Sequence, residues 1–152
     1  MDKFCSFFGH WEIEVTNELV DKLKELIERL IVAGSVNVFL FGGFGQFDEL
    51  CYQIVSELKA KYSYIKRIFV VEKQKYEDKY WKSPNKINKK KYEEIVYYPL
   101  KFNGWSKSIY YRNCEMIDRS DYIVFYVTKT ENSGAFKAYK YALLKKKNTI
   151  LV

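Results

Sequence analysis

Apolar residues follow two alternating patterns along the chain. Short unbroken apolar runs are typical of parallel strands buried on both faces, whereas runs with helical spacing predict helices with one buried face. The short runs lie at 3–8, 36–41, 65–71, 121–128 and 148–152. Helical runs separate them, at 16–34, 46–61, 108–119 and from 133 onward. This alternation predicts an α/β fold of three layers, in which helices cover both faces of a mostly parallel sheet of about five strands.

The stretch Phe39–Leu50 joins an apolar run to a helical run through Gly42-Gly43-Phe44-Gly45. A strand, a glycine turn and a helix N-terminus together can form an anion cradle, because unpaired N–H groups and the positive end of the helix dipole point the same way. The alternative is a tight turn in which Gly43 and Gly45 only relieve crowding. The glycines alone do not decide between these two interpretations.

Two further turns of small residues follow other predicted strands, at Gly9-His10 and at Asn132-Ser133-Gly134. In open α/β sheets, ligands bind beyond the carboxyl ends of the strands, where the strand order switches. We therefore expect the three turns to meet in one crevice, which favours the anion-cradle interpretation.

Length and composition predict one domain spanning residues 1–152, with an irregular basic and aromatic insertion at about 72–106. Within this insertion, the sequence does not decide whether residues 95–98 form a short strand. Eight lysines and three acids between Glu72 and Lys91 account for five of the seven net positive charges. The rest of the chain is close to neutral, so nucleic acid is an unfavoured partner.

The three cysteines and the single histidine limit which metal sites and disulfides the chain can form. Cys5, Cys51 and Cys114 lack metal-ligand spacing and are expected to be reduced thiols of a cytoplasmic protein. We expect no metal, no cofactor and no membrane span.

Four stretches carry a resemblance to a known superfamily. They are Cys5–His10 (CSFFGH), Gly42–Asp48 (GGFGQFD), Arg112–Asp121 (RNCEMIDRSD) and Ser133–Ala135 (SGA). They resemble the SLOG superfamily, the Rossmann-like group that includes Smf/DprA and Lonely Guy proteins, and most closely its small YpsA-like members. The RNCEMIDRSD stretch is the most specific. Trp11 stands where the superfamily usually has arginine.

The resemblance implies binding of nucleotides or nucleotide-derived molecules in the crevice. In the Lonely Guy branch it also implies hydrolysis of an N-glycosidic bond by an arginine and a glutamate. Arg112 matches that arginine, but Ala138 stands at the position of the glutamate. An alanine cannot donate a proton or stabilise an oxocarbenium ion, which favours a binding protein over a hydrolase.

The candidate ligand-binding residues come from all three turns and from the arginine-bearing helix. They are Phe8, Gly9, His10, Trp11, Gly42, Gly43, Phe44, Gly45, Asp48, Arg112, Asn113, Ser133 and Gly134. Each has a structural alternative. Arg112 either contacts a ligand phosphate or pairs with Glu115 or Asp118 on its own helix. Ser133 either contacts phosphate or only caps a helix. Asp48 and Glu49 either contact ribose hydroxyls or are only acids in a first helical turn, where the helix dipole stabilises negative charge.

Three functions follow, in order of preference. The first is a sensor or sequestering protein for a nucleotide or an ADP-ribose or cyclic-nucleotide type of ligand, in prokaryotic or phage conflict signalling. The second is an N-glycosidase that acts on nucleoside 5′-monophosphates through Asp48 or Glu49. The third is a binder of single-stranded nucleic acid that uses Lys73 to Lys91. The resemblance also implies a homo-oligomer, a dimer or higher, whichever of these functions holds.

Overall fold

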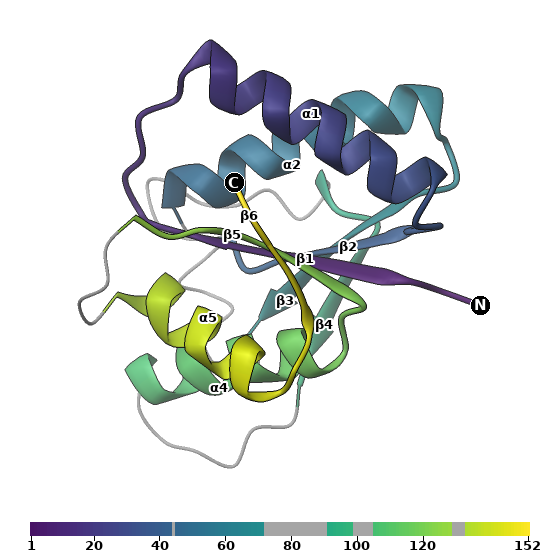
Figure 1. The fold of residues 1–152 in the computed structure, drawn as a ribbon. Coiled ribbons are helices and arrows are strands. Elements are labelled where there is room, and N and C mark those ends of the chain that lie inside the picture. Colours follow the sequence, from purple (N-terminus) through teal and green to yellow (C-terminus); the bar gives the residue numbers. More distant parts are fainter. Residues whose placement is uncertain (44, 72–90, 99–104, 129–132) are drawn as a thin grey trace.

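The computed structural model describes residues 1–43, 45–71, 91–98, 105–128 and 133–152, and for 105 and 106 the backbone alone. Most of the insertion expected at 72–106 lies outside the described residues, as does Phe44. Within them, six parallel strands form one sheet in the order β4-β3-β2-β1-β5-β6. The predicted α/β architecture is confirmed (Figure 1).

The strands and helices alternate along the chain as expected. The strands are β1 (Phe4–Gly9), β2 (Val38–Phe41), β3 (Lys66–Val71), β4 (Glu94–Tyr97), β5 (Tyr122–Tyr126) and β6 (Asn148–Leu151). The helices are α1 (Asn17–Val32), α2 (Gly45–Lys61), α4 (Trp105–Asp118) and α5 (Gly134–Leu144). The sheet has one strand more than the predicted five, because the run left open at 95–98 pairs with β3 as β4.

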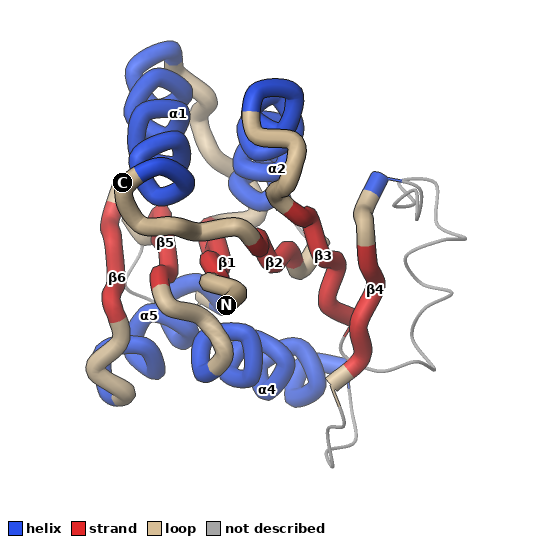
Figure 2. The backbone as a smooth tube through the Cα atoms, turned by 90° about the vertical axis from the view of Figure 1, so that its right-hand side faces the viewer, coloured by secondary structure: helices blue, strands red, loops and turns tan. Residues whose placement is uncertain are grey.

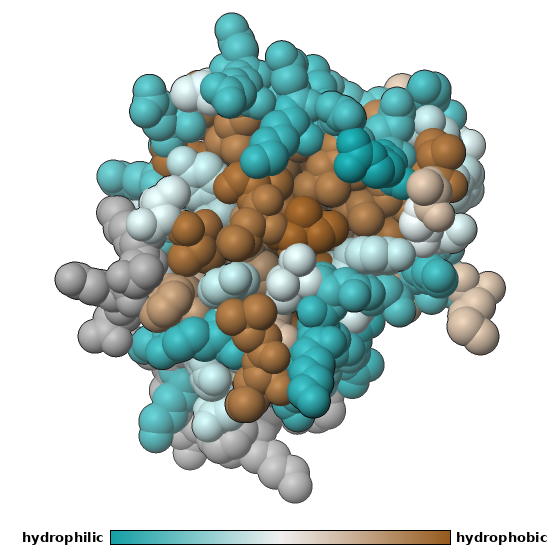
Figure 3. Space-filling model, viewed as in Figure 1, coloured by the Kyte–Doolittle hydropathy of each residue, from teal (hydrophilic) through white to brown (hydrophobic). Residues whose placement is uncertain are grey.

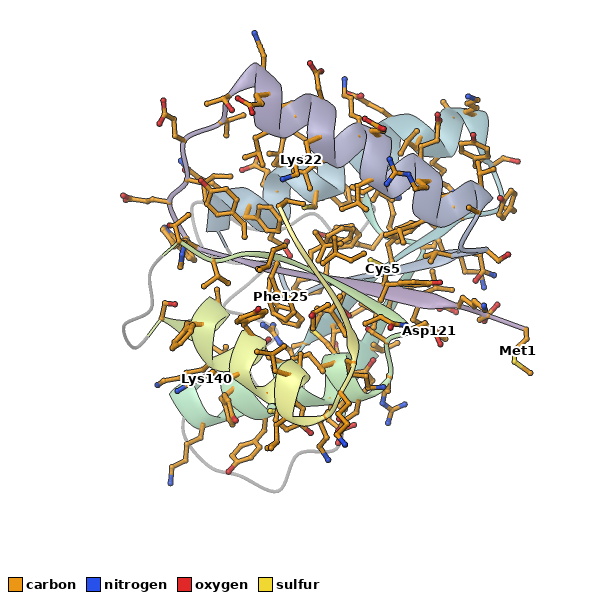
Figure 4. All side chains as sticks on the ribbon, in the orientation of Figure 1. Met1, Cys5, Lys22, Asp121, Phe125 and Lys140 are labelled. Atoms are coloured by element: carbon orange, nitrogen blue, oxygen red, sulfur yellow. The ribbon has the colours of Figure 1, made fainter. Side chains whose placement is uncertain are left out.

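Helices α1 and α2 cover one face of the sheet, and α4 and α5 cover the other (Figure 2). Successive strand residues point to opposite faces, so adjacent phenylalanines enter different halves of the core. Phe7 packs with Phe41 beneath α1 and α2, whereas Phe8 stacks on Phe125 on the side of α4 and α5. Figure 4 labels Phe125 between the sheet and α5. Both faces are therefore buried, as the unbroken apolar runs predicted.

Local signals set the ends of two helices. Thr16 caps α1, and its hydroxyl accepts the N–H of Leu19 at 3.1 Å. Ser133 caps α5 in the same way and accepts the N–H of Phe136 at 3.0 Å. A capping hydroxyl satisfies one N–H that the first helical turn leaves unpaired. The helical run expected from residue 16 thus begins at a cap, and Ser133 is the cap that the sequence offered as the alternative to a phosphate contact.

Strand order switches at β1. The chain moves from β1 outward through β2, β3 and β4, then returns to place β5 on the other side of β1. The segments that leave β1 and β5 therefore diverge at the carboxyl edge of the sheet and open a crevice there. No helix in the described ranges is both long and apolar enough to cross a membrane.

Candidate functional site

A cavity of about 530 Å³ lies at this switch in strand order. Its walls come from the ends of β1 and β2, the first turns of α2 and α5, and the middle of α4. The lining residues are Phe7, Phe8, Gly9, His10, Trp11, Gly42, Asp48, Ile109, Arg112, Asn113, Ser133, Gly134 and Ala135. The three turns that the sequence placed in one crevice therefore all contribute to one cavity.

Arg112 is the buried cation of the cavity, with 3% of its surface exposed. One terminal nitrogen, Nη1, donates to the carbonyl oxygens of Gly42 at 3.0 Å and Val70 at 3.3 Å. Nε and Nη2 donate to Oδ1 of Asn113 at 3.3 and 3.0 Å. The guanidinium thus joins α4 to the ends of β2 and β3 and brings a fixed positive charge to the cavity.

The expected alternative for Arg112, a pair with Glu115 or Asp118 on its own helix, is wrong. Glu115 pairs instead with Arg119 at 3.3 Å, and Asp118 accepts the hydroxyl of Tyr141 at 2.9 Å. The reason is direction: Arg112 faces the sheet, whereas Arg119 and Asp118 are exposed. The helical spacing made a pair on one helix conceivable, but the burial of Arg112 decides its partners.

Asp48 occupies the first turn of α2 and faces back toward the end of β2. Its carboxylate accepts the N–H groups of Gly42 at 3.3 Å and Gly43 at 3.1 Å. Burial raises the pKa of Asp48 to about 7, although the charge of Arg112 and these two hydrogen bonds act in the opposite direction. The side chain therefore exchanges a proton near neutral pH.

The glycine turn consequently serves the fold more than a ligand. Asp48 already occupies the two N–H groups of Gly42 and Gly43. A Cβ on Gly42 would lie 2.7 Å from the guanidinium of Arg112. Gly45 has a φ of +87°, and a Cβ there would lie 2.8 Å from Cα of Trp11. Two of the N–H groups expected to form the anion cradle are therefore occupied by the carboxylate of Asp48, and a ligand role for the rest of this turn stays a prediction.

The loop after β1 is fixed to the neighbouring elements by polar contacts. The carbonyl of Trp11 accepts the N–H of Gln46 at 2.7 Å, and the side chain of Gln46 accepts the N–H of Ile13 at 2.8 Å. Nε2 of His10 accepts the N–H of Thr128 at 2.9 Å. His10 thus ties β1 to the end of β5, while the side chain of Trp11 stays 64% exposed beside the cavity.

The N-terminus of α5 differs from that of α2. The hydroxyl of Ser133 accepts the N–H of Phe136, so this side chain acts as the helix cap that the sequence offered as an alternative to a phosphate contact. The next two N–H groups, of Gly134 and Ala135, donate to no acceptor in the described part of the chain. Apart from its chain neighbours and its own helix backbone, no atom of the described residues lies within 4 Å of a Cβ built on Gly134. Two N–H groups without an acceptor among the described residues, at the positive end of an 11-residue helix, therefore lie at the wall of the cavity.

The remaining candidates divide into three groups. Phe8 and Asn113 lie in the cavity wall as expected, whereas Gly43, Gly45 and Glu49 do not line it. Glu49 is exposed on α2, and Phe44 lies outside the described residues. A catalytic role for Glu49 at this cavity has no geometric support, because its neighbour Asp48 faces inward and Glu49 faces solvent.

Sequence reasoning missed Phe7, Ile109 and Ala135, which also line the cavity. Ile109 was within reach of sequence reasoning, because it precedes Arg112 by three residues and so shares its helical face. Ala138, at the position of the Lonely Guy glutamate, is buried against the sheet and absent from the cavity wall. Across the described ranges, no group of three or more His, Cys, Asp and Glu side chains is arranged to hold a metal. The three cysteines are free and buried.

Comparison with known proteins supports the fold. No protein-family model and no curated protein matches the chain. Among solved structures, DNA processing protein A (DprA) from Streptococcus pneumoniae superposes with a TM-score of 0.64 at 10% identity, over 99% of this chain and 50% of that one. DprA from Helicobacter pylori, described for its binding of single-stranded DNA, gives 0.62 at 16% identity, over 98% of this chain and 64% of that one.

The molybdenum cofactor carrier protein of Chlamydomonas reinhardtii gives a TM-score of 0.57 at 16% identity, over 99% of this chain and 76% of that one. The chain thus spans half to three quarters of the length of these proteins. Their shared architecture confirms the Rossmann-like α/β fold of this chain.

Proposed function

We propose that the cavity binds a nucleotide or a nucleotide-derived molecule of the ADP-ribose or cyclic-nucleotide type. The observation that carries the proposal is the N-terminus of α5, where Gly134 and Ala135 line a cavity of about 530 Å³ and their N–H groups have no acceptor among the described residues. This volume lies within the range of about 300–1,000 Å³ typical of small-molecule sites. An anionic group placed there gains two hydrogen bonds and the field of the helix dipole.

The rest of the wall supplies what the other parts of a nucleotide need. Trp11 and Phe8 offer aromatic surface to a base, and Asn113 and Asp48 offer polar groups to sugar hydroxyls. Arg112 adds positive charge without a direct ligand contact, because the carbonyls of Gly42 and Val70 fix its guanidinium. Micromolar affinity requires roughly 8 kcal/mol, which several such contacts supply together.

We assign the protein a sensing or sequestering role, as expected from the sequence. Among the described residues, the cavity wall contains one carboxylate, Asp48, and Ala138 stands at the position of the glutamate that a Lonely Guy hydrolase uses. The solved structures with this fold include a carrier of molybdenum cofactor and a single-stranded DNA-binding protein, so the fold serves binding in both. A role in prokaryotic or phage conflict signalling is part of the same proposal.

The raised pKa of Asp48 favours one second candidate, an N-glycosidase that acts on nucleoside 5′-monophosphates. A carboxyl group with a pKa of about 7 remains partly protonated at neutral pH and can donate a proton to a leaving base. Loss of that activity in Asp48→Asn, with nucleotide binding retained, distinguishes this candidate from simple binding.

Native mass spectrometry tests the proposal directly. Protein purified from its own source or a related host is examined for a retained nucleotide. Thermal shift is then measured with AMP, ADP-ribose, NAD and cyclic ADP-ribose isomers. We expect at least one to raise the melting temperature and to be recovered intact after long incubation. A released base instead identifies the hydrolase, and no shift with any of these compounds would sink both candidates.

Self-association is a further part of the proposal. Apolar side chains gather in the middle of the face that carries β6, one of the two edge strands of the sheet (Figure 3). Exposed Leu151 lies on β6, and exposed Val32 lies at the end of α1. We propose a homo-oligomer that covers this face, and light scattering coupled to size exclusion measures its mass. A monomer at micromolar concentration would contradict this part.

A further inference from the structure

A second concave surface lies outside the cavity, on the side of the sheet covered by α4 and α5. It is a groove of about 670 Å³ between the two helices. Three lysines, three tyrosines and one leucine form its walls: Lys107, Tyr110, Tyr111, Lys137, Lys140, Tyr141 and Leu144. We call this surface the α4–α5 groove. Its composition alternates cations with flat aromatic rings.

The positive charge of the groove has no internal compensation. Among the described residues, Lys107, Lys137 and Lys140 form no ion pair. Lys140 is exposed and labelled on α5 in Figure 4. Of the two acids near the end of α4, Glu115 pairs with Arg119, whereas Asp118 accepts the hydroxyl of Tyr141 and forms no ion pair with a described lysine of the groove. An anionic partner would therefore meet unpaired cations.

The sequence contains a signal for this groove that the charge count overlooked. Five lysines and no acid lie between Ser133 and Val152. The residues outside the basic segment were expected to be nearly neutral because their charges were summed, and acids elsewhere in the chain cancel these five lysines in that sum. Helix α5 brings two of these lysines, Lys137 and Lys140, one turn apart on the groove wall.

We propose that the α4–α5 groove binds single-stranded nucleic acid. Lysines at both walls meet phosphates, and the rings of Tyr110 and Tyr111, whose centroids are 5.2 Å apart, offer stacking surface to unpaired bases. A purely electrostatic partner such as an acidic peptide uses the lysines but leaves the aromatic surface without a role. The groove is distinct from the nucleotide cavity, and none of its lining residues is shared with it.

Fluorescence anisotropy tests the proposal on the full chain. The labelled probe is an oligo-dT of about 12 nucleotides, a length that spans one such site. In Lys137→Gln/Lys140→Gln we expect affinity to fall at least about fivefold and the slope of log K against log salt to lose about 1.4 in magnitude. The matched control, Lys22→Gln/Lys66→Gln, removes two exposed lysines that lie outside the groove. Its affinity stays within about twofold of the unsubstituted protein, since a surface change elsewhere leaves the contacts intact.

A tyrosine pair separates stacking from charge. Tyr110→Ala weakens binding by at least about fivefold, whereas Tyr110→Phe retains the ring and the affinity. Excess ADP-ribose leaves the oligonucleotide bound, so this assay remains informative even if the nucleotide proposal fails.

Four outcomes would overturn the proposal. They are no oligonucleotide binding, binding that is unchanged in the groove variants, displacement by ADP-ribose, and a groove that takes oligo-glutamate but not oligo-dT.

Discussion

Two helices begin at the same cavity, and their first turns use it differently. At α2, Asp48 folds back and accepts the N–H groups of Gly42 and Gly43, so the turn is closed by its own side chain. At α5, Ser133 caps one N–H group, whereas those of Gly134 and Ala135, at the cavity wall, have no acceptor within the described ranges. The turn with more glycines is therefore the packed one. Glycine content indicates close backbone approach, but it does not show whether a ligand or the protein makes that approach.

The largest loss of stability is expected from a substitution that disrupts the closed turn of α2. In Gly45→Ala, the backbone would keep a φ of +87° with a Cβ 2.8 Å from Cα of Trp11. Strain and overpacking together lower the free energy of unfolding by about 3 kcal/mol. The matched change at the open turn, Gly134→Ala, meets no neighbouring atom of the described residues within 4 Å and stays within about 0.5 kcal/mol of the unsubstituted protein. Urea denaturation measures both, and equal losses would contradict the comparison.

Arg112→Ala removes the cation shared by the closed turn and the cavity. The carbonyls of Gly42 and Val70 lose a buried donor, which costs about 2 kcal/mol of stability. Arg119→Ala on the same helix breaks only an exposed pair with Glu115 and costs less than about 1 kcal/mol. Chemical denaturation of the two variants checks this difference. An Arg112 variant as stable as the Arg119 variant would show that the buried hydrogen bonds contribute little.

Asp48 gives the closed turn a pH dependence. Its pKa in the folded protein, about 7, lies above the value of about 3.9 for an unfolded aspartate. Between these values the folded state holds a proton that the unfolded state releases. Its contribution to stability is therefore fully present below about pH 4 and declines as the pH rises toward 7.

In Asp48→Asn this decline disappears, because the side chain no longer titrates. The difference in unfolding free energy between the variant and the unsubstituted protein therefore changes by at least about 1 kcal/mol from pH 5 to pH 8, in favour of the variant at pH 8. Denaturation curves at the two pH values measure it. A difference that is constant with pH would mean that Asp48 has an ordinary pKa.

Apolar patterning predicted most of the fold. The short runs became buried strands because each strand residue packs against one of two helical layers, and hydroxyl residues before the helical runs became the caps Thr16 and Ser133. The run at 95–98 stayed undecided in the sequence. Only its pairing with β3, a contact between distant parts of the chain, makes it a strand.

The site was predictable in position but not in detail. The rule for parallel sheets located the three turns at one edge, and the cavity lies there. The partners of Arg112 and the return of Asp48 to Gly42 and Gly43 depend on side-chain directions that spacing does not encode. The sequence contains the lysines of α5, but a charge summed over most of the chain does not show their local excess.

The charge of the first turn of α5 tests the central claim most directly. Gly134→Asp places a carboxylate beside the open N–H groups, and Gly134→Asn places a neutral side chain of the same shape there. An acid in a first helical turn stabilises a helix by about 0.3–1 kcal/mol, so Gly134→Asp remains folded. Isothermal titration with ADP-ribose then compares the two. We predict at least tenfold weaker binding in Gly134→Asp than in Gly134→Asn, about 1.4 kcal/mol. Equal affinities would contradict the assignment of the anion site to α5.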